Sequence, residues 1–143
     1  LSYVYQNSNE LDFNQNFKDI EDILYSQMIS PNVQTFMNVT QILEVYGNNG
    51  FQNESYNKVE SIYNYFKDKN ITPYAPVFGN LVKIGNHYFR KLIDDGKVGN
   101  NLVRNIDKYY NWIFDEIKIT KQPIPSYMMD EWETEINVLK QLS

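Results

Sequence analysis

The chain has 143 residues, carries a formal net charge of -5 and contains no cysteine. This length suits one domain, and we expect it to be a segment of a larger protein. Without cysteine, disulfides, thiol nucleophiles and thiolate metal sites are excluded. The acidic balance disfavours autonomous binding to the phosphates of nucleic acid or to an anionic membrane. No apolar run approaches the roughly 20 residues that span a bilayer, so we expect an intracellular protein without membrane contact.

Apolar residues recur at three- and four-residue steps along almost the whole chain, which is typical of amphipathic helices. The pattern predicts six helices, with apolar faces over residues 13–28, 33–46, 56–66, 76–92, 102–117 and 128–142. Their Tyr and Phe stripes are interpreted as core. Turn-forming residues at 47–50 and 94–96 end the second and fourth helices. Six helices joined by short turns imply antiparallel neighbours, so the sequence predicts an all-α fold.

A helix, a short polar stretch, a proline and a new helix with an early aromatic residue recur three times. The prolines are Pro31, Pro73 and Pro123, and the aromatic residues that follow them are Phe36, Phe78 and Tyr127. Proline ends each helix because it cannot continue a helix interior. The prolines are 42 and then 50 residues apart. We interpret this inequality as insertions between the two helices of each hairpin, around residues 48–53 and 91–100.

The recurrence predicts one helical-repeat domain over residues 1–143. Its units are a partial one at about 13–32, two full ones at 33–74 and 75–124, and a partial one at 125–143. Two other interpretations stay open. One is a scaffold of the same repeats that binds proteins and does not contact RNA, and the other is a non-repeating helical bundle.

Residues 30–37 (Ser-Pro-Asn-Val-Gln-Thr-Phe-Met) and 66–73 (Phe-Lys-Asp-Lys-Asn-Ile-Thr-Pro) resemble the pentatricopeptide repeat family. In that family the second helix of a unit leads through a Gly-Ile-x-Pro-like turn into a Thr-Tyr-like start of the next unit. The resemblance covers roughly residues 13–140. It implies a right-handed α-α superhelix, a solenoid of antiparallel helical hairpins, with single-stranded RNA as ligand and a mitochondrial or other organellar location.

The resemblance also implies which side chains would contact RNA. Positions early in a first helix and directly after the turn proline read about one base per repeat in that family. Carried over, the positions are Asn32, Met37, Tyr74, Gly79 and a residue near 123–124, with Gln34, Lys83, Arg90 and Arg104 as non-specific contacts. Only Asn32 among the reading positions can both donate to and accept from a base edge. Tyr74 would stack on a base without sequence preference.

No catalytic constellation is present in this sequence. His87 is the single histidine, and neither a phosphate-binding loop nor a metalloprotease motif occurs. We therefore expect no cofactor, no metal and no catalysis by these residues, although a catalytic domain elsewhere in a longer protein stays open. An unpaired apolar face on the last helix, around Trp132, is the predicted docking surface for a protein partner.

Overall fold

Six α-helices account for most of the chain that the structure describes. The computed structural model describes residues 10–143, so residues 1–9 of the predicted domain lie outside it. The helices are α2 (Glu10–Tyr25), α3 (Val33–Asn48), α4 (Gln52–Asp68), α5 (Ala75–Asp94), α6 (Asn100–Thr120) and α7 (Ser126–Leu142). The predicted all-α class and the six helices are confirmed for these residues. Between residues 10 and 143, no helix combines the length and apolar character that a membrane crossing requires.

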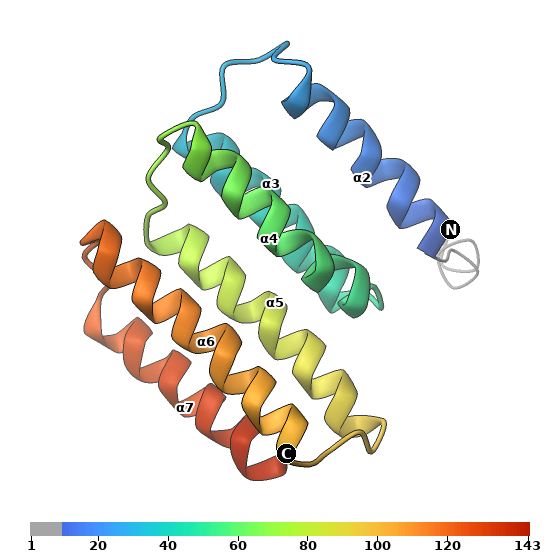
Figure 1. Cartoon of the computed structure of the whole chain (residues 1–143), viewed down its shortest axis with the longest axis vertical. Coiled ribbons are helices and arrows are strands. Elements are labelled where there is room, and N and C mark those ends of the chain that lie inside the picture. The colour runs from blue at the N-terminus through green and yellow to red at the C-terminus, as the bar shows by residue number, and fades with distance from the viewer. Residues whose placement is uncertain (1–9) are drawn as a thin grey trace.

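The helices form two layers, and each helix packs beside the helix two elements further along the chain. In one layer α3 contacts α5 and α5 contacts α7; in the other, α2 contacts α4. Side chains such as Tyr63 and Trp112, with ring centroids 4.9 Å apart, join α4 to α6. Successive helices run in opposite directions (Figure 1). Neighbours within a layer are therefore parallel, whereas the two helices of a hairpin are antiparallel.

The three proline-containing turns share one backbone feature. Each has a non-glycine residue in the left-handed region within two residues of the preceding helix: Gln27, Asn70 and Lys121, with φ of 60°, 58° and 54°. All three turns lie at the same end of the helices in Figure 1, and the two remaining turns lie at the opposite end. Those two turns use glycines at positive φ, which costs no steric strain. The recurrence in the sequence thus corresponds to a recurring turn in space.

The unequal proline spacing comes from helix length. Helices α3 and α4 have 16 and 17 residues, whereas α5 and α6 have 20 and 21. Helix α5 is four residues longer than α3, and α6 is four residues longer than α4. Four residues are about one helical turn, so the apolar face of the longer helix keeps its direction. Only residues 49–51 separate α3 from α4, and the insertion predicted around 48–53 is therefore wrong. Helix α2 also ends at Tyr25 rather than at Met28, because Gln27 leaves the helical conformation.

Helix α5 lies at the centre of the fold and contacts α3, α4, α6 and α7. At Gly85 two rings of α6 lie directly against its backbone: an added Cβ would overlap Tyr109 Cε2 and stand 2.9 Å from the Tyr110 hydroxyl. Both hydroxyls donate to α5, Tyr109 to the Leu81 carbonyl and Tyr110 to Asn86 Oδ1, each at 2.6 Å. The absence of a side chain at Gly85 therefore sets the distance between α5 and α6.

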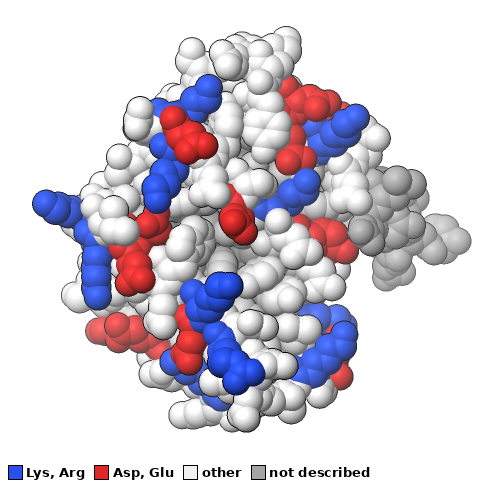
Figure 2. All heavy atoms as spheres, viewed as in Figure 1, with Lys and Arg blue, Asp and Glu red and all other residues white. Residues whose placement is uncertain are grey.

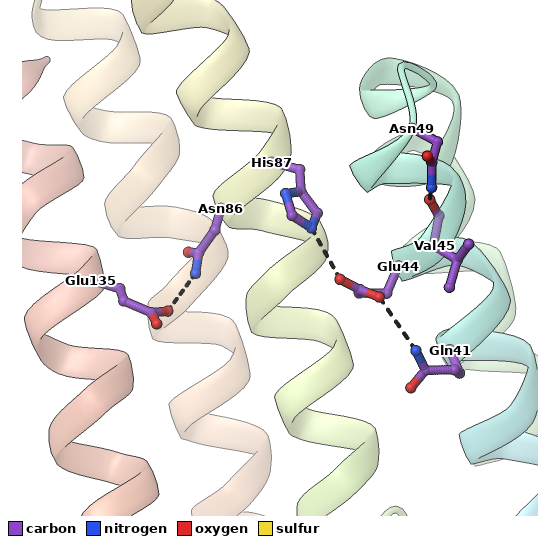
Figure 3. Close-up of polar contacts among 7 residues, drawn as sticks. All are labelled: Gln41, Glu44, Val45, Asn49, Asn86, His87 and Glu135. Carbon is purple, nitrogen blue, oxygen red and sulfur yellow. Dashed lines mark hydrogen bonds and ion pairs between the residues drawn. The ribbon is translucent and has the colours of Figure 1, made fainter. Parts of the chain in front are cut away.

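Polar side chains join α5 to both neighbours in its layer (Figure 3). His87 Nε2 lies 3.1 Å from Glu44 Oε1 of α3, and Asn86 donates to Glu135 of α7 at 2.6 Å. Gln41 donates to the same Glu44 carboxylate at 3.3 Å. The side chains of His87 and Glu44 are 26% and 15% exposed, so water screens this contact less than it would screen a surface pair. These contacts orient α5 relative to α3 and α7.

We predict that Gly85→Ala destabilises the protein by about 2 kcal/mol. The new methyl group would overlap the buried Tyr109 ring, and overpacking of this kind costs about 1–3 kcal/mol. Denaturant unfolding measures the change. Gly79→Ala is the matched control in the same helix, because its Cβ would meet Trp132 at 3.5 Å, an ordinary contact. That variant should be neutral or more stable, since alanine is the better helix former. Equal losses in the two variants would contradict the packing argument.

Candidate binding groove between helices α4 and α6

An open groove lies between α4 and α6, and α5 contributes to its floor. Its volume is about 570 Å³, within the usual range for ligand sites. Figure 1 shows α5 between α4 and α6. The lining residues are Tyr56, Asn57, Val59, Glu60 and Asn64 of α4, Tyr88 of α5, and Asn105, Lys108, Tyr109 and Trp112 of α6. A smaller hollow of about 270 Å³ between α6 and α7 is spanned by the Lys140–Asp107 ion pair.

Among the described residues, the one ion pair between α4 and α6 lies toward the C-terminal ends of both helices. Lys67 Nζ lies 3.2 Å from Glu116 Oε1, and this carboxylate side chain is 7% exposed. One turn earlier in α4, the rings of Tyr63 and Trp112 meet edge to face. Among the described residues, no ion pair joins the two helices closer to their N-termini. The lining residues therefore come from the N-terminal and middle parts of α4 and α6.

Aromatic rings fill the depth of the groove. Tyr56 and Tyr88 are stacked with ring centroids 3.9 Å apart and an interplanar angle of 7°. The ring of Tyr109 lies 5.1 Å from that of Tyr56 and 5.9 Å from that of Trp112. Tyr109 is buried, whereas Tyr56, Tyr88 and Trp112 are partly exposed. The depth of the groove is thus lined by rings with little rotational freedom to lose on binding.

Polar side chains form the rim of the groove. Helix α4 contributes Asn57, Glu60 and Asn64, and α6 contributes Asn105 and Lys108; all five are exposed. None of them makes a side-chain hydrogen bond or ion pair with another described residue. An amide can donate and accept at once, whereas the carboxylate only accepts and the ammonium only donates. The rim can therefore bind a ligand that presents both donors and acceptors.

The rings contribute no charge to the groove at neutral pH. Burial raises the pKa of Tyr56 to about 12, and the neighbouring Tyr88 adds to the shift. Burial also holds the pKa of Tyr109 well above its ordinary value, with a smaller effect of Tyr56. Only Glu60 and Lys108 then carry charge, and they have opposite signs. On the face of the molecule seen in Figure 2, Lys and Arg alternate with Asp and Glu, and no large area carries one sign.

Five of the positions that the family resemblance implies for RNA contact, Asn32, Gln34, Met37, Tyr74 and Gly79, lie on α3 and α5 or next to their N-termini, and none lines the groove. Asn32 caps α3: its Oδ1 accepts from the Thr35 amide at 3.0 Å, and Thr35 Oγ1 accepts from the Asn32 amide at 3.2 Å. Such a reciprocal cap satisfies backbone donors of the first turn. Gln34 is exposed and donates to Asn38 Oδ1 at 3.1 Å.

The other three positions differ in their access to solvent. Met37 and Tyr74 are partly buried and pack against the core, and Gly79 is buried. Trp132 covers Gly79. The structure thus brings the five positions to neighbouring helices of one layer, and their contact with RNA stays a prediction.

The prediction that Trp132 forms an exposed docking surface is wrong. The side chain is 4% exposed, because the apolar face of α7 packs on α5 and the indole lies over Gly79. The large apolar side chains that α7 does expose are Tyr127, Val138 and Leu142. Tyr127 therefore differs from Phe36 and Phe78, its counterparts after the earlier prolines, which are fully buried.

The sequence does not predict the groove, because tyrosine stripes at helical spacing are typical of a core. A signal is nevertheless present: Asn57, Glu60 and Asn64 have the spacing i, i+3, i+7, and Asn105, Lys108 and Trp112 repeat it. Each set lies on one face of a helix. Which two faces oppose each other depends on the packing of α4 beside α6, which no local pattern reports.

Comparisons with family models, with curated proteins and with solved structures find no match for this chain. Within residues 10–143, no three His, Cys, Asp or Glu side chains lie together as metal ligands would. The geometry of the described residues is therefore the basis for a functional proposal.

We predict that stability falls at alkaline pH and that Tyr56 contributes to the fall. A phenol whose pKa is raised on folding adds stability that is complete below pH 10 and lost as the pH rises toward about 12. Tyr56→Phe removes the ionising group and should flatten the decline by at most about 1 kcal/mol per pH unit, discounted for partial exposure. Denaturant unfolding across alkaline pH measures it. Tyr127→Phe, at an exposed ring, is the control, and an unchanged slope for Tyr56→Phe would refute the prediction.

Proposed function

We propose that this chain is a segment of a pentatricopeptide-like helical-repeat protein, a right-handed superhelix of antiparallel hairpins, that acts as a non-catalytic adaptor. In this role it holds a polypeptide partner within organellar, specifically mitochondrial, RNA metabolism. The organellar setting follows from the family resemblance alone. The binding role follows from the groove and its rim of free polar side chains.

The observation that carries the proposal is the regular stacking of proline-turn hairpins. Parallel contacts link α2 to α4, α3 to α5 and α5 to α7, and the three left-handed turns at Gln27, Asn70 and Lys121 recur at one end. Hairpins that stack in this way expose long helical surfaces on both layers, which is the property that repeat proteins use for binding.

Charge favours a polypeptide over RNA as the partner. The chain has 18 acidic and 13 basic residues, and its charged side chains are interspersed on the face seen in Figure 2. Binding to a phosphate backbone draws on clustered lysine and arginine, whereas a protein surface of mixed charge matches another protein.

Single-stranded RNA is the second candidate, and one observation favours it. Exposed Gln34 and Asn38 on α3 bring amides, and exposed Lys83 and Arg90 bring positive charge to the neighbouring helix α5. Amides of this kind can hydrogen-bond to base edges.

Titration with single-stranded oligo(U), oligo(A) and oligo(C) over a series of salt concentrations, followed by fluorescence anisotropy, separates the two candidates. We expect no salt-dependent binding. Selection from a displayed random-peptide library against the same chain should in contrast enrich peptides that bind it in isolation. RNA affinity that falls steeply with salt, as release of counterions requires, together with no enriched peptide, would replace the adaptor by the RNA-binding candidate.

A further inference from the structure

We infer that the groove between α4 and α6 binds an extended polypeptide segment with one apolar side chain between a basic and an acidic residue. This inference rests on the proposed adaptor function and assigns its binding site. The apolar side chain lies on the rings of Tyr88 and Trp112, the basic residue pairs with Glu60, and the acidic residue pairs with Lys108. The three asparagines hydrogen-bond to the peptide backbone.

The two walls of the groove present matched positions. Helices α4 and α6 are parallel, and the Lys67–Glu116 ion pair joins residues 49 positions apart in the sequence. Glu60 and Lys108 are separated by nearly the same interval and therefore lie at one level of the groove, on opposite walls. They form no ion pair with each other or with another described residue, so both charges are available to a ligand between them.

The chemistry of the rim fits a peptide rather than a nucleic acid. A peptide backbone alternates donors and acceptors, and the amides of Asn57, Asn64 and Asn105 can satisfy both without reading a side chain. A phosphodiester chain would meet Lys108 as the single cation of the groove lining. It would also meet the Glu60 carboxylate, which repels phosphate. Opposite charges on the two walls instead match a segment that carries both signs.

The length of the groove limits the segment. Asn57 and Asn64 are seven residues apart on α4, which corresponds to about 10 Å along the helix axis. An extended chain rises about 3.3 Å per residue, so the rim contacts about three residues. A core of one basic, one aromatic and one acidic residue has this length.

Three synthetic peptides test the inference, each acetylated, amidated and flanked by Gly and Ser, with the cores Lys-Phe-Glu, Lys-Phe-Lys and Glu-Phe-Glu. Titration into the isotope-labelled chain, followed by amide chemical shifts, gives both the affinity and the location. We expect the mixed core to bind most tightly, with shifts in α4 and α6 around the groove. Glu60→Lys should transfer the preference to Glu-Phe-Glu, and Lys108→Glu should transfer it to Lys-Phe-Lys, each by about threefold. Asn64→Ala should weaken all three peptides by about fivefold.

Glu131→Lys on α7 and Lys83→Glu on α5 are the matched controls, because both residues are exposed, lie outside the groove and change the net charge equally. They should leave the order of the peptides unchanged. If these control variants change the order of the peptides as much as the groove variants do, the groove is not the site. The same holds if the amide chemical-shift changes lie outside the groove. Peptides from the displayed library that still bind would then leave the adaptor function standing. Oligo(U) that displaces the mixed peptide from the groove would overturn both proposals.

Discussion

The contact between α5 and α6 at Gly85 is the constraint on which the rest of the fold depends. Two tyrosine rings lie against a helix backbone there, and both hydroxyls donate to the same helix. This close approach lets α5 contact four other helices at once. Because the hydroxyls are bonded and the rings are buried, the arrangement satisfies polar groups while it excludes water. Helix α5 thereby becomes the common partner of both layers.

The same contact shapes the groove. Tyr109 is held by its hydrogen bond to the Leu81 carbonyl and cannot fill the space between α4 and α6. Its ring instead lies tilted against Tyr56, which stacks on Tyr88. Beyond the groove, exposed Lys67 of α4 pairs with the buried Glu116 carboxylate of α6. A core contact and a binding surface are therefore parts of one structure.

The two layers differ in the chemistry that they offer. In the layer of α3, α5 and α7, the positions implied by the family resemblance include a helix cap at Asn32 and the buried Gly79. In the layer of α2, α4 and α6, the amides and charges at the rim of the groove surround partly exposed rings and make no side-chain hydrogen bond or ion pair with another described residue. Polar groups without internal partners cost nothing while water solvates them, and they are available to a ligand. This difference directs the binding proposal to the second layer.

The sequence by itself determined the helices and the proline turns, because the apolar period of 3.6 residues and the geometry of proline act locally. The all-α class, the six helices and the recurrence at Pro31, Pro73 and Pro123 follow from these local signals. Only the tertiary structure decided that an added turn per helix makes the spacing unequal, that Trp132 is buried, and that α4 and α6 face each other across a groove. Those outcomes depend on which faces meet and how closely, and residues distant in the sequence, such as Gly85 and Tyr109, set that distance.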